Sequence, residues 1–158
     1  MIDQAVITII SKLKTKMGLE GSKLSYAQTE ADQLGKILCS VSHINLETPL
    51  AARSYRPEQQ LNTSIGILRF RLSFSANFES SAYTEGLRHL STILHYLHQN
   101  SLLTAENTPK LPNGIEKIAI SPFESAKPDE ALPQIAFDVR VMPLEGEDTQ
   151  EIISANII

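Results

Sequence analysis

The residues of this 158-residue chain that could do chemistry begin with its four histidines. His95 and His98 lie three positions apart in a segment with helical periodicity, so they share one helix face, as a metal-binding pair would. His89 projects about 120° away from His95 and about 180° away from His98. His43 belongs to another segment, and no cysteine or carboxylate stands at ligand spacing beside the pair. We expect surface histidines and no metal site, with a small-ligand or metal-dependent enzyme as the weaker alternative.

The other reactive residue types do not form a catalytic pattern. The single cysteine, Cys39, lies in an alternating apolar segment and is expected to be buried, and one cysteine excludes an internal disulfide. The seven glycines lack the spacing of a phosphate-binding loop or a dinucleotide fingerprint. No Gly-x-Ser-x-Gly turn presents a serine nucleophile. Glu145, Glu147 and Asp148 resemble a solvated acidic run. We therefore predict no enzymatic activity, no catalytic residue and no cofactor.

Charge is distributed unevenly along the chain. Residues 1–123 hold 12 basic and 10 acidic residues, a net charge of +2, whereas residues 124–158 hold 2 and 8, a net charge of −6. A protein that binds duplex nucleic acid needs a concentrated basic face, and the sequence shows none. Arg69 and Arg71, on one face of a predicted strand, are interpreted as solvent-exposed charges or contacts to another chain. Asp138 and Arg140 are interpreted as surface charges that pair with a neighbouring strand.

The N-terminal apolar run, residues 5–10, does not resemble a targeting or membrane segment. It is far shorter than the roughly 20 residues that cross a bilayer. Asp3 stands where a signal peptide carries positive charge, and no small-residue cleavage site follows. We expect a soluble protein that works in the cytoplasm, without membrane contact.

Periodicity predicts six main elements. In chain order they are a helix over 2–17, a strand over 36–47, a strand over 65–78, a helix over 83–97, a strand over 115–121 and a strand around 135–141. Gly18 is expected to end the first helix, and Lys12, Lys14 and Lys16 lie near that end, where positive charge suits the helix dipole. A bulge near Gly66 would reconcile two registers of the second strand.

The second helix carries the clearest apolar stripe. Its members recur at spacings of four and three and are Tyr83, Leu87, Leu90, Leu94 and Leu97. We expect this stripe to face the sheet, so that Leu94→Asp would unfold the domain. Gly86 lies beside the stripe, where a missing side chain would let the helix approach the sheet closely. Ser80 and Ser81 are suitable N-cap residues for this helix.

These elements predict an α+β fold in a single domain over residues 1–144. We expect roughly four strands in a mixed or antiparallel sheet, packed by a long central helix and an N-terminal helix. Residues 145–158 would form an acidic C-terminal tail, interpreted as an arm between subunits.

Several runs of the chain resemble one family. They are 72–78 (LSFSANF) followed by the helix 83–97, 104–109 (TAENTP) leading to 114–118 (GIEKI), 132–142 (LPQIAFDVRVM) and the opening 1–5 (MIDQA). Together they are similar to the cap, or tail terminator, proteins of extracellular contractile injection systems of the antifeeding-prophage and virulence-cassette type. The chain is short between Ile120 and Leu132, where many relatives carry an insertion.

The resemblance implies a structural protein with no active site. It implies a ring, six-fold in the family, at the distal end of an inner tube and contractile sheath, where it stops polymerisation and holds the last sheath layer. The implied partners are other copies of the chain and the tube and sheath proteins, within the assembled particle. An assembly adaptor or chaperone of tube or sheath subunits is the alternative.

Two segments are candidates for contacts between subunits. The loop residues Arg53, Tyr55 and Arg56 are of types that often anchor interfaces. The four isoleucines of the tail would be poorly placed in free solvent, and we expect them to pack on a neighbouring subunit; they are Ile152, Ile153, Ile157 and Ile158.

Overall fold

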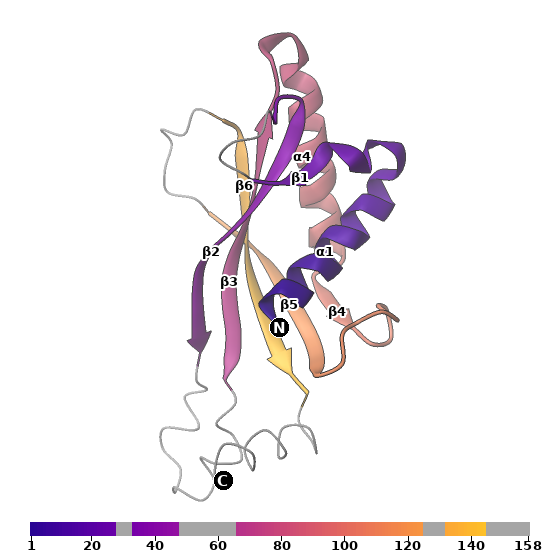
Figure 1. The fold of residues 1–158 in the computed structure, drawn as a ribbon, viewed down its shortest axis with the longest axis vertical. Coiled ribbons are helices and arrows are strands. Elements are labelled where there is room, and N and C mark those ends of the chain that lie inside the picture. Colours follow the sequence, from indigo (N-terminus) through magenta and orange to yellow (C-terminus); the bar gives the residue numbers. More distant parts are fainter. Residues whose placement is uncertain (28–32, 48–65, 125–131, 145–158) are drawn as a thin grey trace, which may run out of the picture.

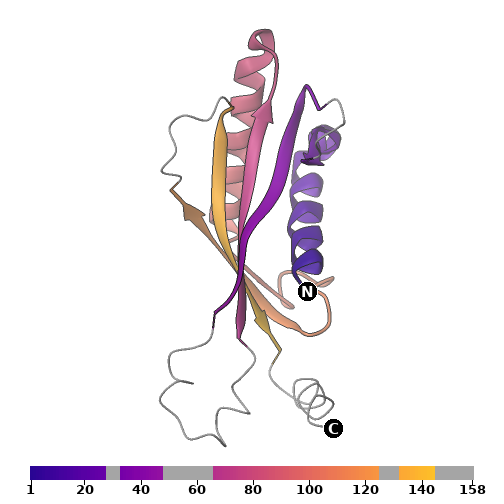
Figure 2. The ribbon, with the colours of Figure 1, turned by 60° about the vertical axis from the view of Figure 1, so that its left-hand side comes forward.

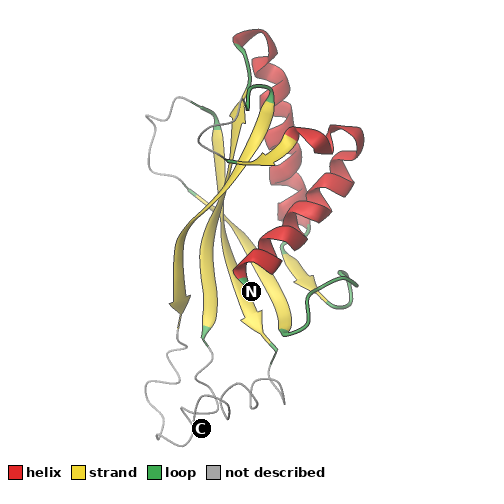
Figure 3. Cartoon of the chain, viewed as in Figure 1, coloured by secondary structure: helices red, strands yellow, loops and turns green. Residues whose placement is uncertain are grey.

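The computed structural model describes residues 1–27, 33–47, 66–124 and 132–144 (Figure 1). Within these ranges the chain forms helices and a single six-stranded sheet (Figure 3). In chain order the elements are α1 (Ile2–Met17), the 3-10 helix η1 (Gly18–Lys23), β1 (Leu24–Tyr26), β2 (Lys36–Glu47), β3 (Ile67–Asn77), the 3-10 helix η2 (Ser80–Ala82), α4 (Tyr83–Gln99), β4 (Leu102–Thr104), β5 (Ile115–Phe123) and β6 (Gln134–Pro143). The predicted α+β class is confirmed.

The sheet is mixed and has the strand order β1-β2-β3-β6-β5-β4. β1 runs parallel to β2, and every other neighbouring pair is antiparallel. The prediction of about four strands was too low, because β1 and β4 are only three residues long. Three residues are too few to show the alternation by which strands are recognised.

Two helices of nearly equal length, 16 residues in α1 and 17 in α4, pack on the sheet. The sheet therefore does not rest on one dominant central helix. α1 has the predicted bounds and ends at Gly18, whose φ of 63° is left-handed and whose N–H donates to the carbonyl of Lys14. Both helices lie against the same face of the twisted sheet, as two views 60° apart show (Figure 2). None of the described helices is long and apolar enough to span a bilayer.

The core lies between this face of the sheet and the two helices. Phe70 and Phe74 of β3 point into it, and the Phe74 ring packs edge-to-face on Phe137 of β6 with ring centroids 5.9 Å apart. Ile9 of α1 and Ile93 of α4 have no exposed surface. Burying a side chain of this size contributes about 1.5–3 kcal/mol, so these residues hold the helices on the sheet.

The prediction that the apolar stripe of α4 faces the sheet is wrong, because the helix is rotated about its axis so that a different set of residues is buried. Its buried residues are Gly86, His89, Leu90, Ile93 and Leu97, whereas Tyr83, Leu87 and Leu94 are 38–50 % exposed. The helix meets the sheet at Gly86, and Ile93 lies about 80° around the axis from Tyr83. The apolar stripe therefore straddles the border of the buried face.

The start of α4 also differs from the prediction. Ser80 and Ser81 belong to η2, and the residue that precedes α4 is Ala82, which makes no side-chain capping hydrogen bond. η2 leads directly into α4, and the Ala82 N–H within η2 donates to the carbonyl of Glu79.

The close approach predicted at Gly86 is present and can be tested. A Cβ atom there would lie 2.9 Å from Phe78 Cδ1 and 3.0 Å from Ala76 Cβ. Gly86→Ala is therefore expected to lower the free energy of unfolding by about 1–3 kcal/mol, although alanine is the better helix former. Urea titration should show this loss. Ser91→Ala on the exposed side of α4 is the control, and a stabilised Gly86→Ala protein would contradict the close contact.

Two strand details differ from the sequence prediction. The register shift lies in β2, between Ser42 and Asn45, rather than near Gly66. Pro122 does not end β5, which continues to Phe123. β4 pairs with Lys117–Ala119, and the Ile120 N–H donates to the carbonyl of Ser101. Beyond Ile120 no described strand lies on this side of β5, so a residue without an N–H is tolerated at Pro122.

Candidate functional site, an open strand edge and a lysine-lined groove

In the described part of the chain, the C-terminal half of β2, residues 40–47, is an open edge of the sheet. β1 pairs only with Ile37–Cys39, and one further hydrogen bond joins the Ala27 N–H to the carbonyl of Cys39. No strand in the described part of the chain pairs with the outer side of residues 40–47 (Figure 1). Such an edge presents backbone donors and acceptors to a further strand.

The open edge is also apolar and bent. Ile44 and Leu46 are 58 % and 60 % exposed. His43 has a φ of 55°, within the register shift between Ser42 and Asn45, and its ring nitrogen Nδ1 lies 2.9 Å from the hydroxyl of Ser42. A bulge of this kind increases the local twist and limits which strands can pair with the edge. The edge is therefore suited to a specific partner.

Charged side chains cross the sheet on the face opposite the helices. Arg69 Nε donates to Asp138 Oδ1 at 2.8 Å, and Arg140 Nε lies 3.3 Å from Glu47 Oε2. The hydrogen bond that Arg69 donates to Asp138, together with the negative charge of that carboxylate, raises the pKa of Arg69. The Arg71 guanidinium lies over the Phe123 ring, 3.7 Å from its centroid.

Asp138 pairs with Arg69 on the neighbouring strand β3, as predicted. Arg140 instead lies beside Glu47 on β2, which is separated from β6 by β3. Arg69 and Arg71 have partners within their own chain, so neither needs another chain for an interaction.

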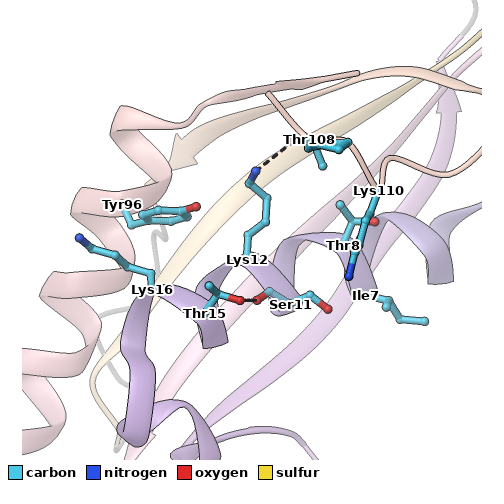
Figure 4. Close-up of a pocket in the computed structure, with 10 residues that line it drawn as sticks. Ile7, Thr8, Ser11, Lys12, Thr15, Lys16, Tyr96, Thr108 and Lys110 are labelled. Carbon is cyan, nitrogen blue, oxygen red and sulfur yellow. Dashed lines mark hydrogen bonds between the residues drawn. The ribbon is translucent and has the colours of Figure 1, made fainter. Parts of the chain in front are cut away.

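A groove of about 700 Å³ lies between α1, α4 and the loop from β4 to β5 (Figure 4). One side is formed by six residues of α1, another by Tyr96 of α4, and the third by residues 108–110 of the loop. The lining residues are Ile7, Thr8, Ser11, Lys12, Thr15, Lys16, Tyr96, Thr108, Pro109 and Lys110. The groove thus joins parts of the chain almost a hundred residues apart.

Lys12 fixes the loop to α1. Its Nζ donates to the carbonyl of Asn107 and to Thr108 Oγ1, both at 3.1 Å. The side chain of Asn107 organises the loop by accepting from the Thr104 N–H and donating to the carbonyl of Leu102. The Tyr96 hydroxyl points toward Lys12 from the opposite side of the groove (Figure 4).

The groove is basic, and none of the described residues that line it is acidic. Lys12, Lys16 and Lys110 contribute ammonium groups, and five hydroxyl-bearing side chains also line the groove. No described carboxylate forms an ion pair with any of the three lysines. Ile7 and Pro109 contribute apolar surface. This lining can bind a carboxylate-bearing peptide.

His89 is buried, contrary to the expectation of surface histidines. It is 2 % exposed, lies 3.3 Å from Glu20 and 3.5 Å from Glu85, and packs against the Phe78 ring. The rotation of α4 places it there. Lys23 donates to Glu85, and this hydrogen bond, assisted by His89, holds the pKa of that carboxyl below its usual range. These charges join η1 to α4.

The remaining candidates for chemistry lie where the sequence placed them. His43, His95 and His98 are exposed. Cys39 is buried, and burial raises the pKa of its thiol to about 12. Across the described ranges, no three side chains of histidine, cysteine, aspartate or glutamate converge as metal ligands.

The predicted interface residues lie outside the described residues. These are Arg53, Tyr55 and Arg56 of the loop, and Ile152, Ile153, Ile157 and Ile158 of the tail. Their roles stay predictions.

Sequence reasoning missed the groove. The lysines of α1 were interpreted only through the helix dipole, although Lys12 and Lys16 stand four residues apart with Ser11 and Thr15 beside them. That spacing indicates a basic, hydroxyl-bearing helix face. Lys110 is brought to this face by the fold alone.

Comparison with protein-family models and with curated proteins finds no match to this chain.

Proposed function

We propose that this chain is the structural cap, or tail terminator, of a phage-tail-like contractile injection system. It forms a homohexameric ring that ends tube and sheath polymerisation and holds the last sheath layer. It assembles in the cytoplasm, stays in the finished particle and has no enzymatic activity. The resemblance of residues 72–78, 104–118 and 132–142 to the cap family supports this specific role.

The open edge of β2 is the structural observation that carries the proposal. An extended arm of another polypeptide can add to residues 40–47 by main-chain hydrogen bonds, while Ile44 and Leu46 bury their exposed side chains against it. Edges of this kind are normally blocked in monomeric proteins. No described strand covers this edge, and its bulge narrows the choice of partner without hiding Ile44 and Leu46, so a specific strand-adding partner accounts for the exposed apolar side chains.

Ring formation needs two different, complementary surfaces on each subunit. The β2 edge lies at one side of the sheet, and α1 with the loop from β4 to β5 lies toward the other (Figure 1). A head-to-tail arrangement can therefore use both sides without the subunit having to pair with itself.

The experiment is reconstitution of tube and sheath subunits with and without this protein, followed by electron microscopy. We expect particles of uniform length with a tagged copy of the chain at one end, and overlong or heterogeneous tubes when it is omitted. Mass spectrometry of purified particles distinguishes a cap, which is retained, from an adaptor or chaperone, which is lost. A protein that remains monomeric and leaves tube and sheath lengths unchanged would defeat the proposal.

A further inference from the structure

The groove and the C-terminal segment carry opposite charges. Lys12, Lys16 and Lys110 line the groove without a described carboxylate partner. Residues 145–151 (EGEDTQE) contain four acidic residues and no basic one. This segment begins directly after the last described residue, Leu144, and lies outside the described residues.

The fold places the start of this segment near the groove. The Leu144 N–H donates to the carbonyl of Gly114 at 2.8 Å, and Gly114 follows Lys110 by four residues. Four residues span at most about 14 Å, so Gly114, and with it Leu144, lies no farther than this along the chain from Lys110 at the groove. The end of β6 and the loop from β4 to β5 lie at the same end of the molecule (Figure 1).

The spacing of the charges also matches. Lys12 and Lys16 are one turn apart on α1, an axial rise of about 6 Å. Alternate residues of an extended chain, such as Glu145 and Glu147, are about 6.7 Å apart. An extended acidic segment along α1 can therefore place successive carboxylates opposite successive lysines.

We propose that residues 145–151 dock into the lysine-lined groove of their own chain. Single exposed ion pairs are weak. The tether nevertheless supplies a local concentration in the millimolar range, and several pairs act together on it. The same docking would direct the isoleucine-rich end of the tail along α1. It is a property of the single subunit, so it can hold or fail independently of the cap function.

Dye anisotropy at the tail tests this docking. Ser154→Cys provides a labelling site, because Cys39 is buried and its thiol pKa is about 12. We expect high anisotropy in 0.1 M NaCl and a fall in 1 M NaCl, where the Debye length shortens from about 10 to about 3 Å. Lys16→Glu should lower the anisotropy in 0.1 M NaCl, and Lys16→Glu/Lys110→Glu should lower it to the high-salt value.

Lys14→Glu is the matched control, because it makes the same charge change at an exposed position of α1 outside the groove. It should leave the anisotropy unchanged, and circular dichroism should show every variant folded. Adding Glu147→Lys/Asp148→Lys to the double variant should restore the high value. Equal effects of Lys14→Glu and Lys16→Glu, or no response to salt, would overturn the proposal. An anisotropy that rises with protein concentration would assign the groove to the tail of a second copy instead.

Discussion

Ile93→Asp is expected to unfold the domain. Ile93 has no exposed surface and lies in the core between α4 and the sheet. An unpaired carboxylate there costs several kcal/mol, which is comparable with the whole stability of a domain of this size, about 5–15 kcal/mol. Circular dichroism and size-exclusion chromatography should show loss of structure or aggregation at 25 °C.

Leu94→Asp, one position further along α4, is the matched control. Leu94 is 40 % exposed, so its replacement should cost about 1 kcal/mol or less and leave the protein folded. This result reverses what the apolar stripe of the sequence predicts. Unfolding by Leu94→Asp together with tolerance of Ile93→Asp would show that α4 is rotated the other way on the sheet.

Ile44→Lys/Leu46→Lys is expected to abolish assembly of the protein into particles while the subunit stays folded. Both side chains are more than half exposed, so lysine there should cost about 1 kcal/mol or less in stability. Charged side chains on an edge strand oppose the addition of another strand. Incorporation into reconstituted particles, measured by mass spectrometry, should fall to the background level.

Leu87→Lys tests whether any exposed apolar residue has the same effect. It lies on α4, away from the β2 edge, and is 38 % exposed. If a partner adds a strand to the β2 edge, Leu87→Lys should reduce incorporation much less than Ile44→Lys/Leu46→Lys. Normal incorporation of Ile44→Lys/Leu46→Lys would remove the β2 edge from the assembly surface.

The sequence predicts the long elements well, because their periodicity spans many residues. The bounds of α1 and β2 agree with the prediction, and the alternation in β3 correctly places Phe70 and Phe74 in the core. β1 and β4 were missed because strands of three residues are defined by their neighbours and not by their own pattern.

The orientation of α4 and the groove required three-dimensional information. Tyr83, Leu87 and Leu94 are apolar enough for the core, and only the contact of Gly86 with Ala76 and Phe78 shows which side of the stripe is buried. The groove needs Lys110 beside α1, a pairing set by the loop and not by local sequence. The sequence shows the negative charge of residues 145–151, but it does not show that three lysines gather in one groove.

The position of β6 has a consequence for how the protein is made. β6 lies between β3 and β5, yet among the described strands it is the last to leave the ribosome. A nascent chain that ends before Gln134 holds β1–β2–β3 and β4–β5 as two partial sheets with no strand to join them. Phe70 and Phe74 of β3 then lack the packing that β6 provides, including the contact between the Phe74 and Phe137 rings. The sheet therefore completes only after β6 has been synthesised, and termination products that lack β6 should depend on chaperones to remain in solution.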